Sequence, residues 1–318
     1  MAASPSSTAT DARPEVGHTP PGPERLTTRE WAQVFKRSFK EFIADDCMGL
    51  AQQVAYSSML AFFPAVAFLL GFLGLFDLYD NVQDFLGSVA PNGVLDFIEG
   101  LQKDNSNESA SATAFVIGAV GALWAASGAM GSIVKAVNRA YELVETRPFW
   151  HVRLTAGFLV VLSGFTTAAI FLLIVAGGPL GEAIAEKAHL GGAWNWIWGV
   201  FRWPIAFGAI LLFFALVYYL APNRDVRNWK WISPGSFVGA LLWLALSGLF
   251  ALYASFSDSY SKTYGSLAAG VILLLWLNYT AWAILFGAEL NSELDRQADI
   301  RAAGGPDAGL LPPVRRTS

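Results

Sequence analysis

The stretch "WLNYTAWAILFGAELNSELDR", residues 276–296, closes an apolar run that begins near Gly265. An apolar run of this length predicts a helix that spans a membrane. It nevertheless keeps an amide at Asn278 in its middle, an acid at Glu289 near its end, and a second amide at Asn291. An unpaired polar group in hydrocarbon is costly, so each of these side chains needs a partner or a function.

The composition of the whole chain agrees with a membrane environment. Hydrophobic residues make up 54% of the 318 residues and charged residues only 14%, whereas about a quarter of a soluble domain is charged. The net charge of −4 gives no excess of Lys and Arg of the kind that nucleic-acid binding requires, so we expect no nucleic-acid partner. The single cysteine, Cys47, cannot form an internal disulfide and is interpreted as a packing residue.

The two ends of the chain differ from its centre. Residues 1–25 are small, polar and rich in Pro, without the apolar core of a signal peptide, and residues 303–318 have the same character. Both ends are therefore predicted to be disordered tails. The folded membrane domain is predicted to cover residues 26–302.

Six apolar windows in this domain are long enough to cross a hydrocarbon core of about 30 Å. They predict an all-α polytopic membrane protein with six transmembrane helices. The windows are Leu50–Phe76, Ala112–Val134, Leu154–Ala176, Trp194–Leu220, Ile232–Phe256 and Ser266–Ala288.

The segments between these windows predict the orientation of the chain. Cytoplasmic loops carry an excess of Lys and Arg, and 17 of the 21 Lys and Arg residues fall in segments on one side. Both termini lie on that side, which is therefore predicted to be cytoplasmic. The other side has only Lys103, Lys187, Arg202 and Lys262.

Two amphipathic segments are predicted to lie outside the membrane core. Thr27 and Glu30 have the spacing of a capping box, so a helix is predicted to begin there. Its apolar and basic residues fit an interfacial helix over anionic lipid, and they fit equally well a helix that packs on the protein's own cytoplasmic face. On the outer side, residues 77–109 predict two short amphipathic helices that form a small cap.

Polar residues also interrupt the first predicted span. Gln53 and Ser57 are one turn apart on one helix face, and Pro64 frees the carbonyl of Leu60 from its helical hydrogen bond. This polar stripe fits a path through the membrane, or hydrogen bonds that merely hold helices together.

The second predicted span has Gly121, Ala125 and Ala129 at four-residue spacing. Such a stripe of small residues lets another helix approach closely, so we expect this helix to be central.

The same helix is predicted to continue beyond the membrane until Pro148 ends it. Arg139 would then pair with Glu142, or Asn138 and Arg139 would together hold a lipid phosphate.

The last span places its polar residues at different depths. With 1.5 Å of rise per residue, Asn278 lies about 16 Å into the helix and Glu289 about 33 Å. Asn278 is expected to be a hydrogen-bonded core amide or part of a polar path. Glu289 is expected to form an ion pair with Arg139 or Arg224 at the cytoplasmic boundary, or to form the inner mouth of such a path.

Four stretches occur in the same order as in a known family. They are "LAQQVAYSSMLAFFP", "NRAYELVETRPFW", "YYLAPNRDVRNWKWISPGSFVGALLW" and "SYSKTYGSLAAGVILLLWLNYTAWAILFGAELNSEL". In these the chain resembles the YihY/BrkB family of bacterial inner-membrane proteins, over about residues 39–294. The resemblance implies six transmembrane helices, both termini in the cytoplasm, and a location in the bacterial inner membrane. The family has carried ribonuclease and virulence-factor labels, and transport or flipping of lipid-like molecules has been suggested for it.

The residues argue against a ribonuclease. Phosphodiester hydrolysis usually needs a general acid and base or carboxylates that hold metal ions. His18, His151 and His189 lie in segments that are not expected to meet, and the acids show no metal-ligand spacing. We therefore predict no catalytic residues, no metal and no cofactor.

The sequence favours a membrane protein that transports or flips a lipid-like or amphipathic molecule, with membrane lipids as its partners. The alternative is a structural or partner-binding membrane protein without transport. A transporter needs its polar residues in one shared path, whereas a scaffold would bury each in its own hydrogen bond. The candidates for the path are Gln53, Ser57, Asn138, Arg139, Asn278, Glu289 and Asn291.

Overall fold

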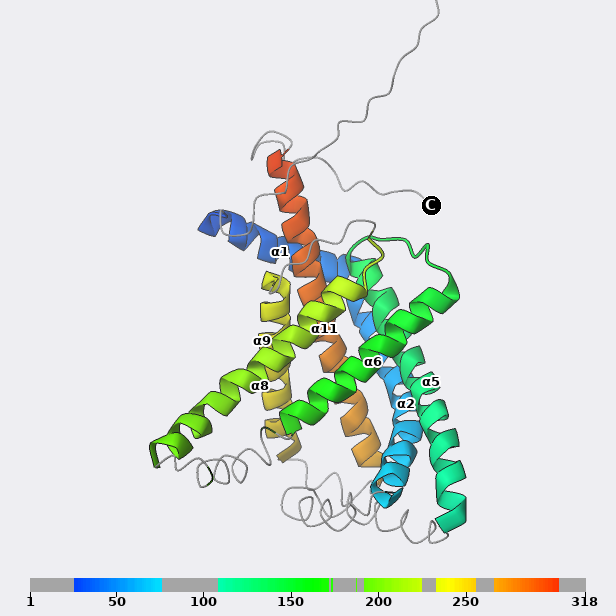
Figure 1. Ribbon diagram of the computed structural model, residues 1–318. Coiled ribbons are helices and arrows are strands. Elements are labelled where there is room, and N and C mark those ends of the chain that lie inside the picture. Colours follow the sequence, from blue (N-terminus) through cyan, green and yellow to red (C-terminus); the bar gives the residue numbers. More distant parts are fainter. Residues whose placement is uncertain are drawn as a thin grey trace, which may run out of the picture.

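A computed structural model describes residues 26–75, 108–171, 192–224, 233–255 and 266–302, together with the single positions 173 and 187. Within these residues the chain is helical and contains no strand, which confirms the predicted all-α class. The predicted tails and almost all of the predicted outer cap lie outside the described residues. Figure 1 shows the helices, with α1 lying across one end of the bundle.

Seven long helices make up the described part, and six of them coincide with the six predicted apolar windows. Their bounds are α1 Thr28–Ala44, α2 Cys47–Leu75, α5 Glu108–Ala140, α6 Phe149–Phe171, α8 Gly192–Leu220, α9 Pro234–Ser255 and α11 Ser266–Ala302.

Five of these helices, α5, α6, α8, α9 and α11, are long and apolar enough to cross a membrane. Helix α2 has 29 residues, about 43 Å of helix, but its first half carries Gln52, Gln53, Ser57 and Ser58 and is less apolar. A sixth span through α2 therefore stays a prediction.

Helix α1 begins where the sequence predicts. The Thr27 hydroxyl accepts a hydrogen bond from the backbone N–H of Glu30, and the Thr27 N–H donates to Glu30 Oε2 over 2.7 Å. The capping box is therefore confirmed. One face of α1 buries Val34 and Phe42 in the protein, where α1 contacts α11, while Phe39 remains exposed on the other side. The protein's own surface thus covers part of this helix, and its contact with lipid stays a prediction.

Helix α5 has the central position that its small residues predict, because it contacts α2, α6 and α11. The stripe contributes only in part. Ala129 is buried, whereas a side chain at Gly121 would meet open space. The core around α5 is formed mainly by aliphatic residues from several helices, among them Val134, Val137, Leu159 and Leu285.

The predicted continuation of α5 to Pro148 is wrong, because the helix ends at Ala140. Glu142 takes a left-handed conformation, with φ of 53°. The N–H of Leu143 donates to the carbonyl of Asn138 over 2.8 Å, and the N–H of Glu142 donates to the carbonyl of Arg139 over 2.9 Å. These two bonds form a Schellman motif, which ends a helix. Glycine usually occupies the left-handed position, so Glu142 gave no sequence signal for it.

The start of α9 packs very closely on α11. A Cβ atom at Gly235 would lie well inside 3.0 Å of the Gly287 carbonyl oxygen, and one at Gly287 would lie 2.6 Å from the Gly235 carbonyl oxygen. Tyr218 of α8 joins this contact by donating its hydroxyl hydrogen to the carbonyl of Ile284 over 2.7 Å. Helix α11 then continues to Ala302, 14 residues beyond the predicted end of its apolar window.

Candidate functional site

The seven candidate residues separate into two groups along the bundle. One group lies at the end where α1 crosses, where α2 begins and α5 ends (Figure 1). The other group lies farther from that end of the bundle, on α2 and α11. The first group comprises Asn138, Arg139, Glu289 and Asn291, and the second Gln53, Ser57 and Asn278.

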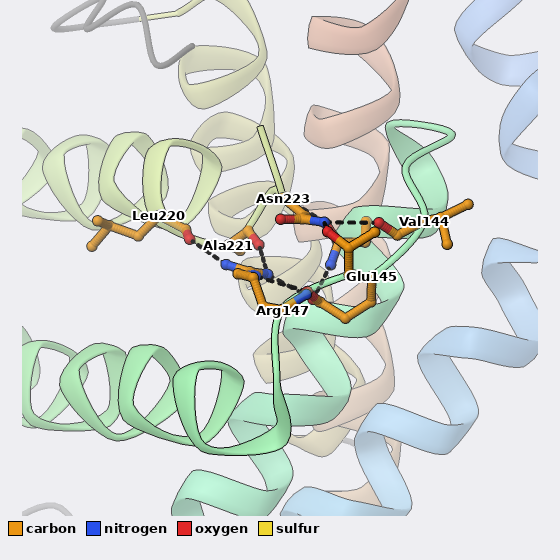
Figure 2. A network of polar contacts seen from close by, with 8 residues as sticks. Val144, Glu145, Arg147, Leu220, Ala221 and Asn223 are labelled. Carbon is orange, nitrogen blue, oxygen red and sulfur yellow. Dashed lines mark hydrogen bonds and ion pairs between the residues drawn. The ribbon is translucent and has the colours of Figure 1, made fainter. Parts of the chain in front are cut away.

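A polar network joins the end of α5 to the end of α8 (Figure 2), and Asn138 belongs to it through hydrogen bonds to Glu145 and Asn223. Its side chain is only 2% exposed. Nδ2 donates to Glu145 Oε2 over 2.7 Å, and Oδ1 accepts from the backbone N–H of Asn223 over 2.8 Å. Both polar atoms of Asn138 therefore have protein partners.

Arg147 completes this network (Figure 2). Its Nε and Nη2 atoms donate to the two carboxylate oxygens of Glu145 over 2.8 and 2.7 Å. Nη2 also donates to the carbonyl of Ala221, just beyond the last residue of α8, over 2.8 Å. The cation thus satisfies carbonyl groups that a helix end leaves without intrahelical partners. Hydrogen bonds from Arg147 also hold the pKa of Glu145 below its usual value.

The lowered pKa of Glu145 predicts acid sensitivity. The Glu145 carboxylate binds a proton less readily in the folded protein than in the unfolded chain. Its contribution to the stability of the fold is therefore fully present above the ordinary pKa of about 4.5, and it is lost as the pH falls through the lower pKa of the folded state. The test range runs from about pH 5 to about pH 3, which brackets the ordinary pKa of a glutamate. Over this range we expect the unfolding temperature in detergent to fall less steeply for Glu145→Gln than for the native protein. Equal slopes would contradict this role of Glu145.

Arg139 is not placed as predicted. It is paired with Asp45, through Nε and Oδ1 at 3.3 Å, rather than with Glu142, and its side chain is 62% exposed. Burial raises the pKa of the Asp45 carboxyl, although Arg139 beside it acts in the opposite direction. Because Asn138 is occupied by Glu145 and Asn223, the structure does not form the predicted phosphate site from Asn138 and Arg139.

Glu289 lies inside the bundle, only 2% exposed. Cys47, the first residue of α2, donates its thiol hydrogen to Glu289 Oε1 over 3.3 Å. The predicted ion pair is wrong, because Arg139 pairs with Asp45 and Arg224 pairs with Asp295 at 2.8 Å. Both arginines meet acids close to the helix ends, whereas the Glu289 side chain meets the start of α2.

Asn291 holds the beginning of α9. Its Oδ1 atom accepts from the N–H of Gly235 over 2.9 Å, and Nδ2 donates to the hydroxyl of Ser233 over 2.9 Å. The first N–H groups of a helix have no partners within the helix. Asn291 of α11 accepts a hydrogen bond from one of these N–H groups and thereby fixes the close contact of α9 with α11.

The second group lies farther from the end of the bundle at which α1 crosses. Ser57 is ten residues beyond Cys47 and Asn278 eleven residues before Glu289, so both lie about 15 to 16 Å from the Cys47–Glu289 contact. Ser132 of α5 donates its hydroxyl hydrogen to Ser57 over 3.1 Å. The Oδ1 atom of Asn278 is buried and has no hydrogen-bond partner among the described residues.

Sequence reasoning missed Arg153, which it assigned to a cytoplasmic segment. The structure makes it the fifth residue of α6, inside the apolar span Phe149–Ile170. Its Nη2 atom donates to the carbonyl of Trp124 over 2.7 Å, and its guanidinium carbon lies 4.2 Å from the centre of the Trp124 ring. An arginine at the centre of a membrane span costs about 2.5 to 3.5 kcal/mol on insertion scales, and Arg153 lies near one end of its span. The predicted apolar window begins one residue later, at Leu154, whereas α6 begins at Phe149, directly after Pro148.

Comparisons with known proteins agree on one family. The virulence factor BrkB family matches residues 38–310. The putative ribonuclease-like protein YfkH of Bacillus subtilis is 28% identical, over 82% of this chain and 95% of its own length. A UPF0761 membrane protein of Idiomarina loihiensis is 25% identical, over 84% of this chain and 94% of its own. One of Stenotrophomonas maltophilia is 27% identical, over 85% of this chain and 63% of its own. No solved structure matches.

Proposed function

The chain is an integral membrane protein that belongs to the virulence factor BrkB family, and from its intramembrane polar residues we propose that it transports or flips a lipid-like or amphipathic molecule. The proposal rests on one observation, a row of polar side chains along α2, α5 and α6. We call this row the polar ladder. It consists of Gln53, Ser57, Ser132 and Arg153.

The ladder follows from helix geometry and two contacts. Residues four apart lie on the same helix face, so Gln53 and Ser57 share a face of α2, and Ser132 and Gly128 share a face of α5. The hydrogen bond from Ser132 to Ser57 joins these two faces. The guanidinium of Arg153 then lies against Gly128, where an added Cβ atom would be 3.1 Å from Nη1.

The ladder runs from the α1 end toward the middle of the bundle. Gln53 lies six residues beyond Cys47, or about 9 Å, and Ser57 about 15 Å from that end. Gln53 is exposed on the surface of α2. Successive hydrogen-bonding groups at increasing depth would let a polar head enter the membrane while its apolar part stays in lipid.

We also propose that α2 is a sixth span and that both termini lie in the cytoplasm of a bacterium, as the Lys and Arg distribution indicates. A reporter fused after Lys103 should therefore report the outer side and one fused after Arg227 the inner side. Finding both reporters on the same side would contradict the six-span topology.

A structural role without transport is the alternative, and a specific observation favours it. Four of the path candidates, Ser57, Asn138, Glu289 and Asn291, each have a hydrogen bond within the protein. The last three lie outside the polar ladder and fit helix fixation better than a path, so we place them outside the proposed path. The word ribonuclease in the name of the Bacillus relative is not extended to this chain, since His151 is exposed on the first turn of α6 and no described group of three or more His, Cys, Asp or Glu could hold a metal ion.

Reconstitution into vesicles separates the two functions. The purified protein is inserted into vesicles that contain a fluorescent phospholipid, and an impermeant reductant bleaches only the outer leaflet. Transport predicts that fluorescence from the inner leaflet is lost faster than in protein-free vesicles. The structural alternative predicts equal rates.

A further inference from the structure

The strongest unassigned feature of the molecule is the guanidinium of Arg153. It contacts α5 at the carbonyl and ring of Trp124 and at Gly128. The Trp124 carbonyl already accepts a hydrogen bond from the hydroxyl of Ser127 over 2.8 Å. Arg153 therefore shares its only described acceptor with another donor.

The positive charge of Arg153 has no acidic partner among the described residues. None of the ion pairs in that part of the chain involves Arg153. Its Nε atom is buried without an acceptor, and Nη1 forms no hydrogen bond to a described residue. A guanidinium has five N–H donors; the buried Nε–H is out of reach, but the two on Nη1 and the second one on Nη2 are left for a ligand.

The position of this cation matters as much as its charge. Gly128 lies twelve residues before the end of α5, about 18 Å along the helix. It is also close to the middle of the apolar span Gly118–Ala140. Beside it the Trp124 side chain is 55% exposed, and only 11% of the α6 span is buried. The guanidinium is therefore held at the edge of the bundle, where lipid can reach it.

We propose that Arg153 binds the phosphate group of an anionic amphipathic molecule part of the way through the membrane. The planar guanidinium matches two oxygens of a phosphate, and phosphates are the anions that membrane lipids themselves supply. Trp124 holds one side of the guanidinium, and the missing side chain at Gly128 leaves it the space it occupies. This inference rests on the proposed function and names its substrate class.

Binding of lipids to the purified full-length protein tests the proposal. Native mass spectrometry compares short-chain phosphatidic acid with the matching diacylglycerol, which lacks the phosphate, and inorganic phosphate is added as a competitor. Arg153→Gln should bind phosphatidic acid about tenfold more weakly, the loss expected for a charge-assisted hydrogen bond. Arg153→Lys should retain part of the affinity, because it keeps the charge and loses the planar pair of donors.

A second pair of variants keeps Arg153 itself. Gly128→Val should weaken phosphatidic acid binding because its side chain occupies the place of the guanidinium. Gly131→Val on the same helix is the matched control, since an added Cβ atom there meets nothing within 4 Å. Similar loss in both variants would contradict a site at Gly128.

Each outcome decides one question. Unchanged phosphatidic acid binding in Arg153→Gln overturns the site. Equal binding of diacylglycerol overturns phosphate recognition, and displacement by inorganic phosphate at similar concentration identifies a free-phosphate site instead of a lipid site. If the native protein binds phosphatidic acid through Arg153 but vesicles show no transport, the site stands and the proposed transport fails.

Discussion

Gly235→Ala is expected to destabilise the protein more than any other addition of a single methyl group to α9. The new Cβ atom would lie within 3.0 Å of the Gly287 carbonyl oxygen and of the Asn291 side chain. The carbonyl belongs to the backbone of a long helix and cannot rotate away. Overpacking of this kind costs about 1 to 3 kcal/mol, and separation of the helices would also break the hydrogen bond from the Gly235 N–H to Asn291.

The measurement is the unfolding temperature of the purified protein in detergent. Gly248→Ala is the matched control, because it lies on the same helix and its added Cβ atom meets no atom within 4 Å. Gly248→Ala should change the unfolding temperature little or raise it, since alanine favours a helix by about 1 kcal/mol over glycine. Equal destabilisation by both variants would show that α9 does not meet α11 at Gly235.

Arg147→Ala is expected to have the second largest effect, a loss of about 2 to 3 kcal/mol of unfolding free energy. The substitution removes both hydrogen bonds to the Glu145 carboxylate and the one to the Ala221 carbonyl (Figure 2). The arginine side chain is only 13% exposed, so the groups it leaves behind are poorly placed to bind water instead. Arg147→Lys should restore only part of the stability, because lysine cannot pair with both carboxylate oxygens at once.

Arg139→Ala provides the control for Arg147→Ala. The ion pair between Arg139 and Asp45 is longer, at 3.3 Å, and the arginine is largely exposed. Exposed ion pairs contribute between about 0 and 1 kcal/mol. Denaturant unfolding of the two variants should therefore differ clearly. A loss at Arg139 equal to that at Arg147 would contradict the importance of the network between α5 and α8.

The helices were predictable because their signal is local. A window of about 20 apolar residues reports its own length and composition, and the pair Thr27 and Glu30 reports the start of α1 by spacing alone. The end of α5 was not predictable in this way, because Glu142 adopts a left-handed conformation that the sequence does not reveal. The start of α6 was missed separately, because the apolar window for the next helix began at Leu154 whereas α6 begins at Phe149, and this left Arg153 in a loop.

Partners across helices were the least predictable feature. Glu289 was expected to meet an arginine because both lie near the same end of the bundle. Which acid each arginine meets depends on how α1, α2 and α11 pack, and that packing brings Cys47 to Glu289 instead. Ser57 shares a helix face with Gln53 by its spacing alone, but its partner Ser132 is 75 residues away in the sequence. The ladder therefore became visible only when the two helices were seen together.

The most direct test of the proposed transport compares two adjacent glutamines of α2. Gln52 and Gln53 are both exposed, but consecutive residues point about 100° apart around a helix, and only Gln53 shares the face of Ser57. The measurement is the rate at which a fluorescent phospholipid crosses vesicles that contain equal amounts of each folded variant. The proposal predicts that Gln53→Leu slows the crossing markedly, whereas Gln52→Leu keeps the native rate. Equal rates for both variants and the native protein, or a native rate no faster than in protein-free vesicles, would contradict it.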